Sequence, residues 1–193
     1  ILHAIVDSYS ACVNQPVQRL FFTLSAILNH RLYGGDACDS YAHSPGNYSV
    51  PTFVSIDDQY AEWYHDRYKN LPVLDRKLVL PVQKAIQGHP EAGQMWDTHI
   101  NSILFSPNLN FRTTTHDRCI YHTKFKGVKV LLLHQTNDFA INCPSEETSK
   151  KIFDIIGQKL QLPLEDEPPF EYFGLIKDFN GIDVHQANEY IEI

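Results

Sequence analysis

Two apolar segments joined by a short polar turn constrain the fold of this chain more than any other feature. Residues 128–134 and 139–143 are rich in aliphatic side chains, and Gln135-Thr136-Asn137-Asp138 separates them. Segments of this length and composition are typical of buried strands. A tight polar connection between two such strands favours an antiparallel hairpin. The sequence therefore predicts an antiparallel sheet with one of its turns at residues 135–138.

Other segments predict further strands of an antiparallel arrangement. Residues 119–123 precede the first apolar segment, and residues 124–127 between them predict a turn. Residues 32–38 read as a strand whose two glycines allow another backbone or a ligand to approach closely. Near the end of the chain, Asn180-Gly181 is a strong two-residue turn signal and predicts a hairpin between residues 170–177 and 182–185.

Helices are predicted where apolar residues recur at helical spacing. Residues 16–28 form such a segment with Pro16 in its first turn, and residues 91–105 form a second. A third runs from its cap at Ser145 to about residue 160, and a more polar helix is expected at 57–68, capped by Asp57 or Asp58. Mixed helices and antiparallel hairpins indicate the α+β class, with an antiparallel sheet backed by helices.

Composition excludes several classes of protein. The 193 residues are 43% hydrophobic and 20% charged, which is ordinary for a globular chain. The net charge of −7 argues against a strongly basic nucleic-acid module. Lys129 interrupts the longest apolar run, so no membrane span is expected. The four cysteines form no C-x-x-C pair, which argues against a zinc site and favours reduced thiols in an intracellular protein.

Two aspartates are placed where carboxylates could meet. Asp36 belongs to a predicted strand that runs into a loop, and Asp138 lies in the turn between the two apolar strands. Carboxylates on adjacent strand ends can hold hard cations, and two such cations about 4 Å apart promote phosphoryl transfer. Aspartates in turns also commonly accept hydrogen bonds only from nearby backbone N–H groups. The residues alone leave both interpretations open.

Three ordered motifs make the chain similar to the reverse transcriptases of copia-type retrotransposons. The motifs are DACDSYA at 36–42, KAIQGHPEAGQMW at 84–96 and QTND at 135–138. The similarity continues through residues 173–176, 181–182 and 186–191, so it covers the chain from about Pro16 onwards. The resemblance implies a polymerase palm with part of the fingers. Residues 1–193 would then be a single reverse-transcriptase region, truncated at both ends and lacking the thumb, RNase H and integrase domains.

The resemblance also implies roles for individual residues at a catalytic centre. Asp36, Asn137 and Asp138 occupy the catalytic positions, and Asp36 and Asp138 would be the ligands of Mg²⁺ in a two-ion site. Asp39 and Ser40 occupy positions that line the incoming triphosphate.

Further roles concern the sugar, the template and the primer. Tyr41 corresponds to an aromatic ring that excludes the 2′-hydroxyl of a ribonucleotide, although a buried packing role is the alternative. Gln87 and Gly88 match a segment that packs against template and nucleotide. Gln135, Phe173 and Gly174 fall at primer-positioning elements.

The implied partners are an RNA or DNA template–primer, deoxynucleoside triphosphates and the remaining domains of a retrotransposon polyprotein. No membrane partner is expected. The implied location is an intracellular one, in a cytoplasmic particle or in the nucleus.

One departure from the family pattern bears directly on activity. The family's turn reads Tyr-x-Asp-Asp, whereas here Gln135 replaces the aromatic residue and Asn137 replaces the first carboxylate. One unit of charge acting on another at about 4 Å is worth roughly 4 kcal/mol at an effective dielectric constant near 20. We therefore expect an impaired RNA-directed DNA polymerase. The alternatives are a decayed or domesticated non-enzymatic binding or structural module, and another two-metal enzyme such as a nuclease, which the motif order disfavours.

Overall fold

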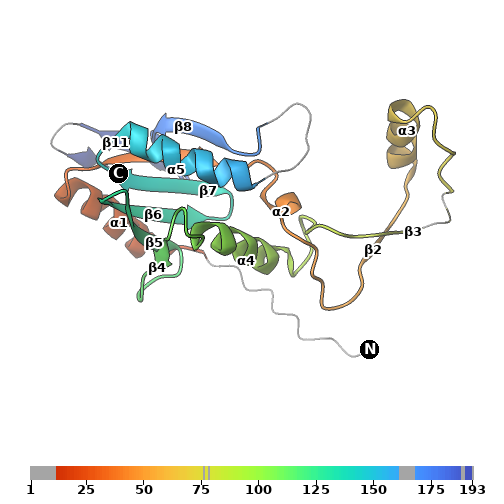
Figure 1. Ribbon diagram of the computed structural model, residues 1–193, viewed down its shortest axis with the longest axis horizontal. Helices are drawn as coiled ribbons and strands as arrows, with labels where there is room; N and C mark the ends of the chain where they lie inside the picture. The colour runs from red at the N-terminus through yellow and green to blue at the C-terminus, as the bar shows by residue number, and fades with distance from the viewer. Residues whose placement is uncertain (1–11, 76, 78, 161–167, 188–189, 193) are drawn as a thin grey trace.

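A six-stranded antiparallel sheet forms the centre of the molecule, as Figure 1 shows for this computed structural model. The structure describes residues 12–75, 77, 79–160, 168–187 and 190–192. The order of strands across the sheet is β4-β5-β6-β7-β1-β8. Their bounds are Arg31–Asp36 for β1, Arg112–Thr113 for β4, Ile120–Phe125 for β5, Val128–Gln135 for β6, Asp138–Cys143 for β7 and Glu171–Leu175 for β8. The predicted mixture of helices with an antiparallel sheet is confirmed.

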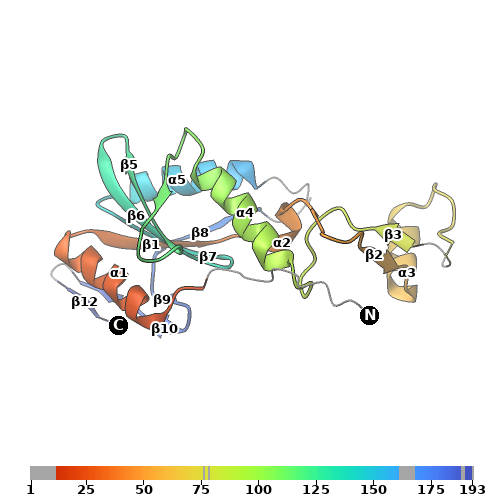
Figure 2. The same ribbon diagram turned by 90° about the horizontal axis from the view of Figure 1, so that it is seen from below.

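Helices cover both faces of the sheet. On one face lies α1 (Gln15–Ile27), whose Phe21 and Phe22 pack with Leu32, Leu133 and Ala140 of the strands. On the other face lie α4 (Ala92–Leu104) and α5 (Glu146–Lys159), which bury side chains against the opposite sides of the same strands (Figure 2). Alternate residues of each strand therefore face two separate cores.

Local capping explains where the predicted helices begin. The Ser145 hydroxyl accepts a hydrogen bond from the backbone N–H of Thr148, and Asn14 caps α1 in the same way through Val17. Asp57 caps α3 (Asp58–Arg67) by accepting from the backbone N–H of Tyr60. The predicted caps at Ser145 and Asp57 are confirmed. Within the described part of the chain, every helix is too short or too polar to cross a lipid bilayer.

An arm extends away from the sheet between β1 and α4 (Figures 1 and 2). The short helix α2 (Ser40–His43) follows β1. The arm then forms a two-stranded sheet of β2 (Phe53–Ser55) and β3 (Val79–Pro81), and α3 lies between these strands in the chain. The chain returns to the sheet at α4, so the segments on both sides of the arm lie close to the end of β1.

The predicted terminal hairpin is wrong in its pairing. Asn180 and Gly181 do form a tight turn, with φ of 50° and 75°, but the turn joins β9 (Asp178–Phe179) to β10 (Ile182–Asp183). The strand β8 instead pairs with β1 and becomes an edge of the main sheet. Two further short strands, β11 (His185–Gln186) and β12 (Ile191–Glu192), pair with each other.

Glycines in β1 explain why β8 docks beside it. A Cβ atom at Gly35 would lie 2.3 Å from the ring of Phe170, and one at Gly34 would lie 2.8 Å from the side chain of Ile176. The residues that flank β8 on either side therefore pack directly on the β1 backbone. No side chain larger than hydrogen fits at either position without displacement.

Candidate functional site

Asp36 and Asp138 meet where β1 and β7 lie side by side. Asp36 is the last residue of β1, Asp138 is the first residue of β7, and the two are Cα partners in the antiparallel ladder. Such partners have Cα atoms about 4.5–5.5 Å apart. Both residues share the strand parity of Leu32 and Ala140, so they belong to the sheet face that α1 covers further along the strands. The expected adjacency of the two aspartates is confirmed.

The electrostatics of this pair oppose full ionisation. Burial raises the pKa of Asp36 to about 6, and the charges of Asp138 and Glu171 act in the same direction. A hydrogen bond from the Asn137 side chain partly offsets this by lowering the pKa of Asp36. Burial, followed by the charge of Asp178, also raises the pKa of Asp138. None of the groups that shift the pKa values of Asp36 and Asp138 is a cationic side chain. A bound cation would therefore offset the negative charge that accumulates here.

The turn that carries Asn137 is held by two buried donors. Thr136 has φ of 55°, a left-handed conformation that is rare for a β-branched residue. Trp96 Nε1 donates to the Thr136 carbonyl, and His134 Nε2 lies 2.6 Å from the same oxygen. Burial lowers the pKa of His134 to about 4, so the ring is neutral at pH 7 and its Nε2 carries the donated proton. The unusual turn is therefore fixed from α4 and from β6, a feature that the sequence analysis missed.

A cavity of about 600 Å³ is lined by Ala37 and Asn137, the chain neighbours of the two aspartates, although neither aspartate lines it. It brings together Asp39, Ser40 and Tyr41 of the loop and helix after β1, Gln87 of the segment before α4, and Asn137 of the turn. These are four of the five predicted nucleotide-binding residues and one predicted catalytic residue. The fifth, Gly88, does not line the cavity but follows Gln87 directly, with φ of 88° and open space around its Cα atom.

The predicted primer-positioning residues do not gather at one place. Phe173 lines a separate cavity of about 380 Å³ together with Asp138 and Asp178. Gly174 is the ladder partner of Gly34 on β1, with φ of 75°. The Gln135 side chain lies outside both cavities and donates from Nε2 to the Cys12 sulfur at 3.3 Å. Of the three predicted primer-positioning residues, only Phe173 therefore shares a cavity with a predicted catalytic residue.

The donor set fits one hard cation better than two. Asp36 and Asp138 supply carboxylate oxygens, the ligands that Mg²⁺ prefers. Asn137 supplies no charge, and its side chain already hydrogen-bonds to Asp36. Within the described residues, no group of three His, Cys, Asp or Glu side chains is arranged to hold a metal ion. Two magnesium ions would place four positive charges against two carboxylates, so the residues fit a single weakly held ion.

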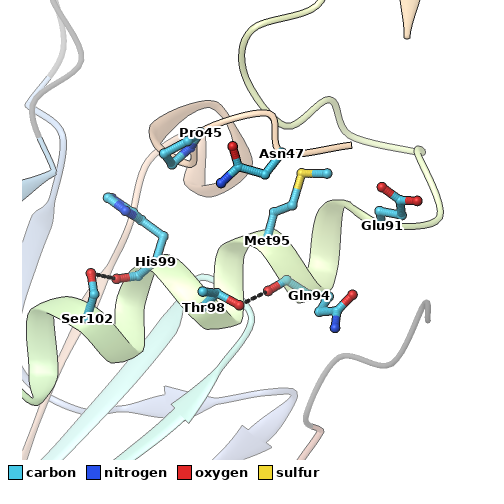
Figure 3. Close-up of a pocket in the computed structure, with 8 residues that line it drawn as sticks. All are labelled: Pro45, Asn47, Glu91, Gln94, Met95, Thr98, His99 and Ser102. Atoms are coloured by element: carbon cyan, nitrogen blue, oxygen red, sulfur yellow. Dashed lines mark hydrogen bonds between the residues drawn. The ribbon is translucent and has the colours of Figure 1, made fainter. Parts of the chain in front are cut away.

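A third cavity, of about 390 Å³, lies on the outer side of α4 and was not anticipated from the sequence (Figure 3). Its α4 residues follow helical spacing, and the Glu91 carboxylate accepts a hydrogen bond from the backbone N–H of Ser49 at 2.9 Å. Thr98 and Ser102 donate to carbonyls of their own helix. None of the predicted site residues lines it. The lining residues are Pro45, Asn47, Glu91, Gln94, Met95, Thr98, His99 and Ser102.

Comparison with known proteins adds no relative to this picture. No family model, no curated protein and no solved structure matches the chain.

Proposed function

We propose that this chain is the palm, with part of the fingers, of a copia-type reverse transcriptase, and that Asn137 impairs its nucleotidyl transfer. The observation that carries the proposal is the ladder pairing of Asp36 with Asp138, whose chain neighbours Ala37 and Asn137 line a 600 Å³ cavity together with Tyr41 and Gln87. The motif order along the chain adds support, because three motifs distant in sequence contribute to this one region.

The carboxylate pair supports phosphoryl chemistry through its charge. Asp36 and Asp138 lie at one end of adjacent strands, and their raised pKa values reflect burial of negative charge. A magnesium ion held by these two side chains would neutralise charge on a reacting phosphate group. Their rigid placement on strands, rather than on loops, fixes the two ligands relative to each other.

The cavity supports recognition of a nucleotide. Its volume of about 600 Å³ lies within the usual range for small-molecule sites. Tyr41 is half-buried against the core below, which holds its ring as one wall of the cavity. A rigid ring can exclude an added hydroxyl by contact alone. Gln87 offers an amide with both a donor and an acceptor, as recognition of a base or sugar requires.

Asn137 lowers the expected activity of the site. It keeps an oxygen ligand but lacks the charge that an aspartate would place beside a divalent ion. The roughly 4 kcal/mol assigned to one unit of charge at about 4 Å corresponds to about a thousandfold in rate. This magnitude predicts an enzyme that is barely active rather than one with altered specificity.

A non-enzymatic nucleotide-binding or nucleic-acid-binding module is the second candidate. The hydrogen bond from Asn137 to Asp36 favours it, because this contact lowers the pKa of Asp36 and so offsets part of the effect of burial where a cation would otherwise be needed. The two candidates share the cavity and differ in catalysis.

Templated primer extension separates the two candidates. We expect the wild-type chain to add few or no deoxynucleotides in Mg²⁺, and Asn137→Asp to raise incorporation by orders of magnitude. The matched control is the double variant with Asp36→Asn, which removes a remaining carboxylate and should abolish the regained activity. Equal incorporation by wild type and Asn137→Asp at every Mg²⁺ concentration would exclude the proposed role of Asn137.

A further inference from the structure

Lys84 is the cationic residue of the cavity that contains Tyr41 and Gln87. Among the described residues that line this cavity, no other carries a positive charge, and Asp39 carries the one formal negative charge. The sequence alone predicts no role for Lys84. A nucleoside triphosphate is strongly anionic, so a site for it needs a cationic group that reaches the phosphates.

The backbone at Lys84 is held firmly against the segment that follows α2. Lys84 forms a β-bridge with Pro45, and its carbonyl accepts a hydrogen bond from the Tyr48 hydroxyl at 2.7 Å. The next residue, Ala85, donates from its backbone N–H to the Ser44 carbonyl at 3.1 Å. These contacts use main-chain atoms of Lys84, so its side chain can be changed without removing them. They also fix Lys84 relative to Tyr41, because Tyr41 lies in α2, directly before the segment that makes these contacts.

No acidic side chain in the described part of the chain pairs with Lys84. Its Nζ atom makes a long hydrogen bond, 3.4 Å, to the carbonyl of His43, and it forms no salt bridge within the described residues. The side chain is exposed and therefore accessible to a ligand.

Two nearby histidines respond to this charge. Burial is the main cause that lowers the pKa of His43 and of His99, and the charge of Lys84 lowers both further. The charge of Lys84 is therefore felt at His43 and at His99, and His99 lines the third cavity rather than the one that contains Tyr41.

We propose that the Lys84 ammonium binds the phosphate groups of a nucleoside triphosphate in this cavity, an inference that rests on the proposed function and deepens it. Lys84 lines the cavity from the segment before α4, and Asn137 lines it from the turn beside the carboxylate pair. A triphosphate that reaches from Lys84 toward Asp36 and Asp138 would place its reacting phosphate near the carboxylates. Lys84 is then a binding residue that distinguishes nucleotide from nucleoside.

Equilibrium dialysis with radiolabelled dTTP and with thymidine, in Mg²⁺ and with the full chain, tests this assignment. The variants are Lys84→Gln, Lys84→Arg and, as a control, Lys150→Gln on the exposed surface of α5. A hydrogen bond between charged groups at an exposed position predicts about a tenfold loss of dTTP affinity in Lys84→Gln. Thymidine affinity should not change, Lys84→Arg should retain most of the dTTP affinity, and the control should match wild type.

Two results would overturn the assignment. One is equal dTTP affinity of Lys84→Gln and wild type, and the other is a wild-type chain that binds dTTP no better than thymidine. Primer extension distinguishes failure of the Lys84 assignment from failure of the proposed function. If Asn137→Asp extends primers and adding Lys84→Gln leaves the KM for dTTP unchanged, the assignment of Lys84 fails alone. If Asn137→Asp is inactive but dTTP binding still depends on Lys84, the polymerase proposal fails and the phosphate site stands.

Discussion

Replacing Asp36 by asparagine should stabilise the metal-free protein at neutral pH. The folded environment raises the pKa of Asp36 from 3.8 to about 6, mainly through burial and secondly through the charge of Asp138. The folded state therefore holds this proton more tightly than the unfolded chain does. The stabilisation that the protonated Asp36 carboxyl group contributes is fully present below about pH 4 and is lost as the pH rises through about 6. At pH 7 an ionised Asp36 thus destabilises the fold.

The size of this effect follows from the same two pKa values. A difference between about 6 and 3.8 corresponds to about 3 kcal/mol. Asp36 is only partly buried, and solvent screening lowers the expected value to about 1–2 kcal/mol. For a chain of this length, each kcal/mol changes the midpoint of thermal unfolding by roughly 2–4 °C. Asp36→Asn should therefore raise the midpoint by several degrees at pH 7.5.

Thermal unfolding in EDTA at pH 7.5 and pH 4.5 measures this effect. We expect Asp36→Asn to be more stable than wild type at pH 7.5 and to differ much less at pH 4.5. Asp154→Asn, an exposed position on α5, serves as the control for loss of one negative charge. An Asp36→Asn variant that is less stable than wild type at pH 7.5, or that keeps the wild-type pH profile, would refute the electrostatic reasoning.

Two further predictions concern substrate choice and nucleic-acid affinity. In the Asn137→Asp background, Tyr41→Ala should admit ribonucleotides, measured as the ratio of ribonucleotide to deoxynucleotide incorporation, and an unchanged ratio would leave Tyr41 as a packing residue. With a net charge of −7, the wild-type chain should bind a primer–template with a Kd no tighter than about 10⁻⁶ M at physiological salt, and more weakly as salt rises. Fluorescence anisotropy at two salt concentrations measures this, and nanomolar binding that is insensitive to salt would contradict it.

The turn that carries Asp138 could be predicted because its determinants are local. Apolar strands on both sides of a tight turn fix where Asp138 lies. The pairing of β1 with β7, which brings Asp36 beside it, joins distant segments, and its expectation rested on the resemblance to a polymerase palm. The caps at Asp57 and Ser145, like the turn, were predictable from local sequence, since a capping side chain acts on a backbone N–H three residues along.

Local sequence patterns did not determine the partner of the strand β8. The partner of β8 is β1, and the contacts that select it involve Phe170 and Ile176 on the glycines of β1. Local turn chemistry at Asn180-Gly181 was read correctly, but it could not show that the preceding strand pairs elsewhere. The same limit applies to the site. Trp96 and His134 both contact the Thr136 carbonyl, and this arrangement depends on how α4 packs against the sheet.

Cation binding by the carboxylate pair is the most direct test of the central claim that Asp36 and Asp138 act together. Titration of the wild-type chain with Mn²⁺, followed by electron paramagnetic resonance, should show a bound ion that Mg²⁺ displaces. Asp36→Asn and Asp138→Asn should each lose this ion, Asp154→Asn should retain it, and Asn137→Asp should bind it more tightly. Mn²⁺ binding that is the same in wild type, Asp36→Asn and Asp138→Asn would contradict the claim.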